Sequence, residues 1–207
     1  MKKIYPLLLA ILLLTFTGEK LTAQTYENDS KSAILDNMLS RRAIRKYTPQ
    51  HVSKAQIDTI MKYAVYAPSA WNKQPWEIRV VQNKQWLEDL NKRYIDAQET
   101  KPKNPKFSVF HNSPTLIVIA RDKNNATSYM DCGIILQNIL LSSHGIGLGS
   151  CPLVLPVPVI NAPKNEDLLR ILNIPEDYEV VVCISLGYAT ENPPVRARDA
   201  NRIKIIE

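Results

Sequence analysis

Arginine is the side chain best suited to hold a phosphate, and this chain carries two close groups of arginines. Arg41, Arg42 and Arg45 lie within five residues, and Arg196 and Arg198 alternate near the C-terminus. A planar guanidinium donates two parallel hydrogen bonds to anionic oxygens, so either group could clamp a phosphate monoester. Alternate residues of an extended segment point the same way, which would turn Arg196 and Arg198 toward one anion. Taken alone, each group is more simply explained as a solvated basic surface.

The loop Tyr66–Trp76, with the sequence YAPSAWNKQPW, is a second candidate. Pro68 and Pro75 restrict its backbone, which lowers the entropy lost when the loop is held in one shape. A flat heteroaromatic with C=O and N–H edges needs uncharged donors and acceptors. The loop offers three such side chains, those of Ser69, Asn72 and Gln74. A polar turn with two prolines is at least as good an interpretation of these residues by themselves.

The segment Gly145–Val154 is rich in glycine and proline, and we expect it to be an irregular loop. Backbone N–H groups of such a loop can donate to a ring nitrogen or an oxyanion. A connector between a helix and a strand would use the same residue types equally well. The segment is therefore a candidate only in combination with others.

Several catalytic patterns are missing from the sequence. We find no GxSxG, no Walker loop, no paired-carboxylate signature and no plausible Ser/His/Asp trio. The three histidines have no metal-ligand spacing, so we expect no metal. If the chain is an enzyme, a cofactor must carry the chemistry.

Hydrophobic periodicity predicts the elements that position these candidates. Helices and buried strands alternate without strict βαβ order, which favours an α+β fold over a Rossmann sheet. In chain order we expect a helix from Ile34 into Arg42, a helix capped by Ser53 and Gln56 and ended by Pro68, a strand over 77–82, a helix over 86–94, a strand over 115–120, a helix over 128–144 ended by Gly145, a helix over 165–172 and a strand over 178–186. The polar tail 189–207 ends in an apolar patch that needs a neighbour, either its own domain or a second subunit.

The first residues have the pattern of a secretory signal peptide. Lys2 and Lys3 precede the apolar run Tyr5–Phe16, which is short for a membrane span. Polar residues follow, and then a small-residue cleavage region that ends at Ala23. We therefore expect a signal peptide over 1–23, one domain over 24–207 and export to the periplasm. An uncleaved membrane anchor is the alternative.

The composition indicates which kinds of partner and which cysteine states to expect. Removing residues 1–23 lowers the formal charge from +6 to +4, an excess too mild to indicate nucleic acid. Cys132, Cys151 and Cys183 lie in apolar or small-residue stretches and are expected to be buried free thiols. An oxidising compartment would permit one disulfide, with no pair favoured by the sequence.

Four segments taken together resemble the FMN-dependent nitroreductase family. They are RRAIRKYTPQHVS, APSAWNKQPW, DCGIILQNILLSSHGIGLGSCP and SLGYATENPPVRAR. They occur in family order and at family spacing between about Ile34 and Arg198. The resemblance implies a three-layer α+β fold with a central mixed or antiparallel sheet flanked by helices. It also implies an intertwined homodimer with FMN at the interface.

By position, the resemblance assigns cofactor-binding residues and no catalytic side chain. It implies that the phosphate and ribityl end is held by Arg41, Arg42, Ala43, Arg45, Arg196 and Arg198. It implies a flavin-contacting loop, often from the other subunit, formed by Pro68, Ser69, Ala70, Asn72 and Gln74. It implies a segment along the isoalloxazine, with a backbone N–H toward N5, formed by Pro152, Leu153 and Val154.

The chain departs from the family pattern in three respects. Ala43 stands where the family commonly has Ser, which removes a hydroxyl contact worth on the order of 1 kcal/mol. Trp71 occupies a variable position and could stack on the substrate or narrow its space. The chain is also short, so a helical lid over the substrate would be reduced.

The implied reaction is ping-pong. A donor, NAD(P)H in the family, reduces the flavin and leaves, and a nitroaromatic, quinone or similar electron-poor molecule then takes the electrons. Export would separate the enzyme from cytoplasmic NAD(P)H, so the donor stays open. The alternatives are a non-catalytic FMN-binding or carrier protein, a scaffold with a decayed site, and a flavin-dependent enzyme resembling reductive dehalogenases.

Overall fold

The computed structural model describes residues 32–207. The expected signal peptide over 1–23 and the polar stretch after it lie outside the described residues. The chain divides into two units, the first ending at Arg41 and the second comprising Arg42–Glu207. Residues 32–40 of the first unit form a helix, as their apolar spacing predicts, and four large apolar side chains of this helix are exposed.

Within the described residues, the second unit contains a four-stranded antiparallel sheet in the order β1-β2-β4-β3. The strands are β1 (Trp76–Val81), β2 (Thr115–Asp122), β3 (Gly149–Leu153) and β4 (Tyr178–Gly187). The two middle strands, β2 and β4, carry the longest apolar runs. Residues 116–120 of β2 are fully buried, as expected for a strand covered on both faces.

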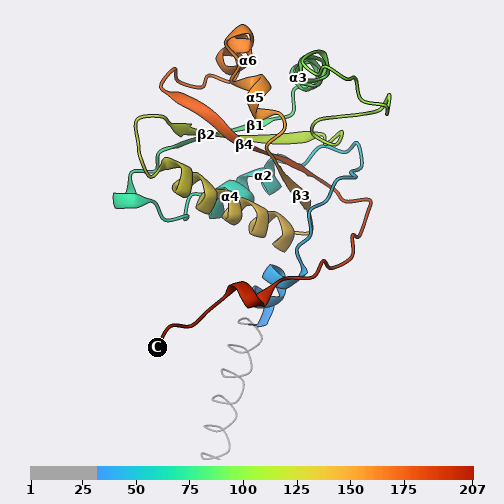
Figure 1. Cartoon of the computed structure of the whole chain (residues 1–207). Helices are drawn as coiled ribbons and strands as arrows, with labels where there is room; N and C mark the ends of the chain where they lie inside the picture. The colour runs from blue at the N-terminus through green and yellow to red at the C-terminus, as the bar shows by residue number, and fades with distance from the viewer. Residues whose placement is uncertain (1–31) are drawn as a thin grey trace, which may run out of the picture. The chain divides into compact units, whose positions relative to one another are not determined.

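Helices cover both faces of the sheet (Figure 1). On one face lie α2 (Lys54–Ala64) and α4 (Ser128–Gly145). On the other lie α3 (Lys84–Asp96), α5 (Val157–Ile160) and α6 (Glu166–Ile171). Each face has its own core, with Ile117 and Ile184 packed toward α4 and Leu116 and Val118 packed toward α3. The expected three-layer α+β fold is therefore confirmed, with the sheet antiparallel.

A local signal explains the start of α2, whereas the predicted end of α4 differs from the structure. The Ser53 Oγ accepts a hydrogen bond from the Gln56 N–H at 3.3 Å, and the Gln56 Oε1 accepts one from the Ser53 N–H at 3.2 Å, which is the predicted capping box of α2. The prediction that Gly145 caps α4 is wrong. Gly145 is the last helical residue, and Gly147 takes the left-handed conformation with φ of 80°.

The expectation of an irregular loop over Gly145–Val154 is also wrong, because Gly149–Leu153 form the edge strand β3. Pro152 is compatible with this strand because an edge strand need not donate every N–H. Gly149 permits a close approach of the preceding chain. A Cβ at this position would lie 2.9 Å from side-chain carbons of Ile44.

Two further details differ from the sequence prediction. The short helix α5 and the 3-10 turn η2 (Pro163–Asn165) were not expected, whereas the helix predicted over 165–172 is present as α6. The three cysteines are buried and free, as expected. Among the helices of residues 32–207, none combines the length and apolar character needed to cross a bilayer.

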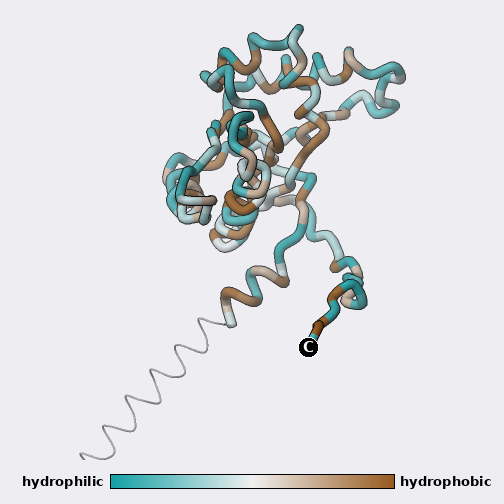
Figure 2. The backbone as a smooth tube through the Cα atoms, turned by 60° about the vertical axis from the view of Figure 1, so that its left-hand side comes forward, coloured by the Kyte–Doolittle hydropathy of each residue, from teal (hydrophilic) through white to brown (hydrophobic). Residues whose placement is uncertain are grey.

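The C-terminal tail leaves β4 at residue 188 and is extended apart from a 3-10 turn, η3 (Ala200–Arg202). The end of the tail is brown in Figure 2, the colour of apolar residues. Ile203, Ile205 and Ile206 are 78–88% exposed. The tail therefore presents an apolar patch that its own unit does not cover.

Candidate functional site

The arginine-bearing segment, residues 42–47, runs along the sheet edge in an extended conformation. Ala43 forms a bridge with Ser150, and the Ile44 N–H donates to the Ser150 carbonyl at 3.1 Å. Further along, Tyr47 forms a bridge with Ala189. These contacts place the segment between β3 and the chain that follows β4.

A partly buried phenol fixes this segment. The Tyr47 hydroxyl donates to the Ile44 carbonyl and lies 2.8 Å from the Ser185 Oγ. Burial raises the pKa of Tyr47 well above its ordinary value, and the hydrogen bond with Ser185 opposes this only in part. Tyr47 is therefore a neutral donor that holds the backbone beside Arg45.

Arg45 is exposed, and its guanidinium donates to the Ala43 carbonyl at 3.4 Å. Within residues 32–207, no ion pair joins this guanidinium to a carboxylate. The backbone N–H of Arg45 donates to the Glu191 Oε1 at 2.5 Å. Because its guanidinium forms no ion pair within residues 32–207, Arg45 can still bind an anion.

His111 is also influenced by these charges. Burial lowers the pKa of His111, the charge of Arg45 lowers it further, and the charge of Glu191 raises it.

Sequence reasoning missed Tyr47, His111 and Glu191 as neighbours of Arg45. Tyr47 and Glu191 lie inside the two arginine-containing motifs, so their position in the sequence was a usable signal. His111 carried no such signal, since only the fold brings residue 111 near residue 45.

The loop between α2 and β1 is held in an unusual conformation. Trp71, Asn72 and Gln74 all have positive φ, between 48° and 55°, a region that non-glycine residues rarely occupy. The Ser69 Oγ accepts the Gln74 N–H at 2.9 Å, and the Ser69 carbonyl accepts the Asn72 N–H at 3.0 Å. The Ala70 N–H donates to the Asp131 Oδ1 at 3.2 Å. These hydrogen bonds fix the backbone of the loop where it faces the protein.

The outer side of this loop faces solvent. Pro68, Asn72 and Gln74 are exposed, and the Trp71 ring is 84% exposed with the Lys73 Nζ 5.6 Å from its centroid. An exposed indole on a rigid loop is a surface that a partner or a flat ligand can cover.

The segment Pro152–Val154 closes β3 and alternates in burial. Pro152 and Val154 are exposed, whereas Leu153 is 6% exposed and packs in the core. A hollow of about 680 Å³ opens beside Val154, lined by the end of α3, by α5 and by Leu155. Most of its lining side chains are aliphatic, so it suits an apolar or aromatic molecule.

The sheet register shows which predicted regions meet. The arginine segment and Pro152–Val154 are joined through Ser150, which pairs with Leu186 of β4. The loop lies at the opposite end of the sheet, where the Asp122 N–H donates to the Pro75 carbonyl and Asp122 pairs with Tyr178. The stretch from Tyr178 to Leu186 spans about 26 Å at roughly 3.3 Å per residue. One chain therefore does not bring the loop to Arg45.

Two other assignments stay predictions. Arg196 and Arg198 are exposed in the tail, where the Arg198 guanidinium donates to the Arg196 carbonyl at 3.2 Å. Arg41 is the last residue of the first unit. No contact within residues 42–207 joins Arg196 or Arg198 to Arg45.

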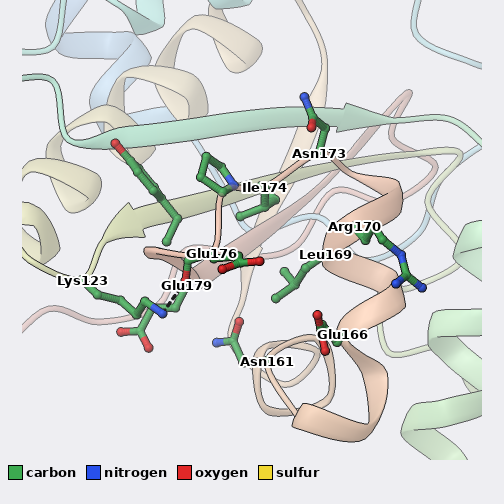
Figure 3. A pocket seen from close by; sticks show the side chains of 11 residues that line it. Lys123, Asn161, Glu166, Leu169, Arg170, Asn173, Ile174, Glu176 and Glu179 are labelled. Atoms are coloured by element: carbon green, nitrogen blue, oxygen red, sulfur yellow. Dashed lines mark hydrogen bonds between the residues drawn. The ribbon is translucent and has the colours of Figure 1, made fainter.

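A separate polar pocket of about 530 Å³ opens beside α6, which contributes Glu166 and Arg170 (Figure 3). On its opposite wall, the Lys123 Nζ donates to the Glu176 carbonyl at 2.5 Å. None of the predicted cofactor-binding residues lines this pocket, so it does not belong to the candidate site.

The fold and these segments define a flavoprotein-like α+β architecture, and comparison identifies the family. A model described as "Nitroreductase family" matches residues 38–188, so the chain belongs to the nitroreductase family. A relative from Methanothermobacter thermautotrophicus, named as a candidate NADH dehydrogenase/NAD(P)H nitroreductase, is 32% identical over 89% of this chain and 92% of its own. The 4-nitrobenzoate reductase of Pseudomonas putida is 27% identical over 76% of this chain and 86% of its own.

A solved structure supports the same placement. A Bacteroides fragilis nitroreductase with bound FMN superposes with a TM-score of 0.75 at 25% identity, over 84% of this chain and 98% of that chain. The resemblance stated from the four motifs and the expected fold are both confirmed.

Proposed function

We propose that this chain is an FMN-dependent oxidoreductase that works as a homodimer and reduces nitroaromatic, quinone or similar electron-poor small molecules. One observation carries the proposal. The arginine segment pairs with β3, β3 leads into Pro152–Val154, and an apolar hollow opens beside Val154. Membership of the nitroreductase family and the FMN-bound neighbour support the choice of cofactor.

The residues present fit FMN by their donor chemistry. A flavin phosphate needs a guanidinium that is not already paired with a carboxylate, and within residues 32–207 the Arg45 guanidinium forms no ion pair. The isoalloxazine needs a flat apolar support, which the exposed Val154 and the adjacent aliphatic hollow supply. When bound, FMN would supply the electron transfer that the protein's own side chains cannot perform.

In this proposal the residues bind and orient, and none acts as an acid or base. The phosphate end is held by Arg41, Arg42, Ala43, Arg45, Arg196 and Arg198. Pro152, Leu153 and Val154 lie along the ring, and the loop residues Pro68, Ser69, Ala70, Asn72 and Gln74 close the site. Tyr47 holds the backbone on which Arg45 is mounted.

The sheet register supports the proposed homodimer. Because the loop and Arg45 lie at opposite ends of one sheet, both would contact one FMN only if a second copy brought its own loop to the first copy's phosphate segment. Exposed apolar side chains at Tyr66, Met130 and Ile205 supply surface that such a partner would bury.

We also propose that residues 1–23 are a signal peptide and that the domain 24–207 is exported to the periplasm. If the signal stayed uncleaved, the domain would be anchored to the membrane. The name of the Methanothermobacter relative supports NAD(P)H as donor. An exported enzyme would instead need a reductant available outside the cytoplasm.

The test is a pair of anaerobic half-reactions on the purified full-length protein loaded with FMN. We expect NADH or NADPH to bleach the visible flavin band and 4-nitrobenzoate or menadione to restore it after the donor is removed. Dithionite serves as the control for chemically accessible flavin. If dithionite alone bleaches the band and neither nicotinamide does so, the protein is a flavin carrier or uses another donor, and the NAD(P)H assignment is wrong.

A further inference from the structure

Asp131 is a buried carboxylate to which the proposed site gives no role. It lies in the first turn of α4 and is 3% exposed. A carboxylate removed from water is unfavourable unless its oxygens accept hydrogen bonds. Its burial therefore calls for partners, and both oxygens have them.

The two carboxylate oxygens face different segments. The Oδ1 accepts the Ala70 N–H of the loop at 3.2 Å. The Oδ2 accepts the Thr127 hydroxyl at 2.9 Å, and that hydroxyl also lies 2.9 Å from the Asn125 Oδ1. Asp131 thus ties the loop between α2 and β1 to the rigid start of α4, across 61 residues of sequence.

The loop needs such an external tie. Three of its non-glycine residues, Trp71, Asn72 and Gln74, have positive φ, a backbone conformation that is strained for residues other than glycine. Strained conformations persist only where surrounding groups fix them. The Ser69–Gln74 hydrogen bond fixes the loop from within, and the Asp131 hydrogen bond fixes it to the body of the protein.

We infer that Asp131 is a positioning residue that holds the strained turn Ser69–Gln74 in the shape that contacts the flavin. This inference rests on the proposed role of the loop in FMN binding. Asp131 does not touch the cofactor; it acts through the Ala70 backbone. Its charge suits the site because an anion is favoured at the N-terminus of a long helix.

The experiment compares Asp131→Ala with Asp131→Asn in the full-length protein. Asparagine keeps an Oδ1 acceptor for the Ala70 N–H, and its amide can donate to the Thr127 hydroxyl, whose proton can turn to Asn125. We expect Asp131→Ala to weaken FMN binding about tenfold, the scale of one lost charge-assisted hydrogen bond. We expect Asp131→Asn to stay within about threefold of wild type.

The readouts separate positioning from general stability. The FMN dissociation constant and the visible circular dichroism of bound flavin report the site, and thermal unfolding of the FMN-free protein reports the fold. Asn83→Ala, which removes the cap of α3 far from the loop, is the matched control. It should lower the melting temperature and leave both flavin readouts unchanged.

The outcomes are distinguishable. Unchanged FMN binding in Asp131→Ala, with weaker binding in Asn72→Ala, would overturn the inference and leave the loop assignment standing. If both variants bind FMN as wild type does, the loop is not at the flavin and both claims fall. Should Asp131→Ala fail to fold, Thr127→Val removes the hydroxyl that supports Oδ2 and also contacts the Asn125 Oδ1, and its failure to weaken FMN binding would likewise overturn the inference.

Discussion

A single partly buried phenol, that of Tyr47, gives the arginine segment its fixed position. It joins the Ile44 carbonyl to the Ser185 hydroxyl, so the backbone that carries Arg45 is bonded to β4 rather than merely packed against it. Loss of a buried hydrogen bond costs about 1 kcal/mol, and stranded partners add to this.

The substitution Tyr47→Phe should therefore lower the free energy of unfolding by about 1–2 kcal/mol at neutral pH. The penalty should shrink above pH of about 10, the ordinary pKa of tyrosine. Folding raises the pKa of Tyr47, so its stabilisation is complete below the unfolded pKa and is lost as the unfolded phenol ionises. Urea unfolding from pH 7 to pH 11 measures the difference.

Phenylalanine has no ionisable group, so the difference between wild type and variant at each pH removes the contribution of the other tyrosines. A wild-type-minus-variant difference that stays constant across the same pH range would show that the Tyr47 phenol is not buried in the folded state.

At the scale of elements, β3 supports the site because Gly149 lets Ile44 approach it. A methyl group added at Gly149 would lie 2.9 Å from the Ile44 Cβ, Cγ1 and Cγ2 atoms. Real Cβ atoms do not tolerate such a contact, so the extended segment would have to move away from β3.

We therefore expect Gly149→Ala to destabilise the protein by about 1–3 kcal/mol and to weaken FMN binding. In an Ile44→Ala background, which removes two of the three contacting carbons, the same change should cost clearly less. Chemical denaturation of the four proteins of this cycle measures the coupling. Equal costs in both backgrounds would mean that Ile44 and Gly149 are not in contact.

Sequence alone predicted the elements whose signals are local. The capping box at Ser53 and the buried run in β2 needed no tertiary information, and both are confirmed. β3 was missed because glycine and proline have low strand propensity and its existence depends on non-local pairing with β4. The candidate residues came mainly from motif resemblance, whereas the register that separates the loop from Arg45 is a tertiary property that no spacing reveals.

At the scale of the whole molecule, the proposed homodimer builds each flavin site from two chains. It brings the loop of one copy to Arg45 of the other, because about 26 Å of strand separates the two regions within one copy.

This sharing predicts complementation between two defective chains. Arg45→Ala damages the phosphate segment, and Asn72→Ala damages the loop, so each homodimer should bind FMN weakly. In a co-expressed mixed dimer, one of the two sites combines an intact Arg45 with an intact Asn72. Purified by two different tags, the mixed dimer should bind FMN with wild-type affinity at one site per two chains. No recovery would place both residues in the same chain's site or in none.

The most direct measurement is an FMN titration of the full-length wild-type protein beside Arg45→Ala and Lys46→Ala, followed by gel filtration. Arg45 and Lys46 are adjacent, exposed and equally charged, but alternate residues of an extended segment face opposite sides. We predict that wild type and Lys46→Ala elute with the flavin spectrum and that Arg45→Ala loses FMN, with a dissociation constant at least about tenfold higher. A wild-type protein that elutes colourless after FMN addition, or equal losses in the two variants, would contradict the proposed flavin site.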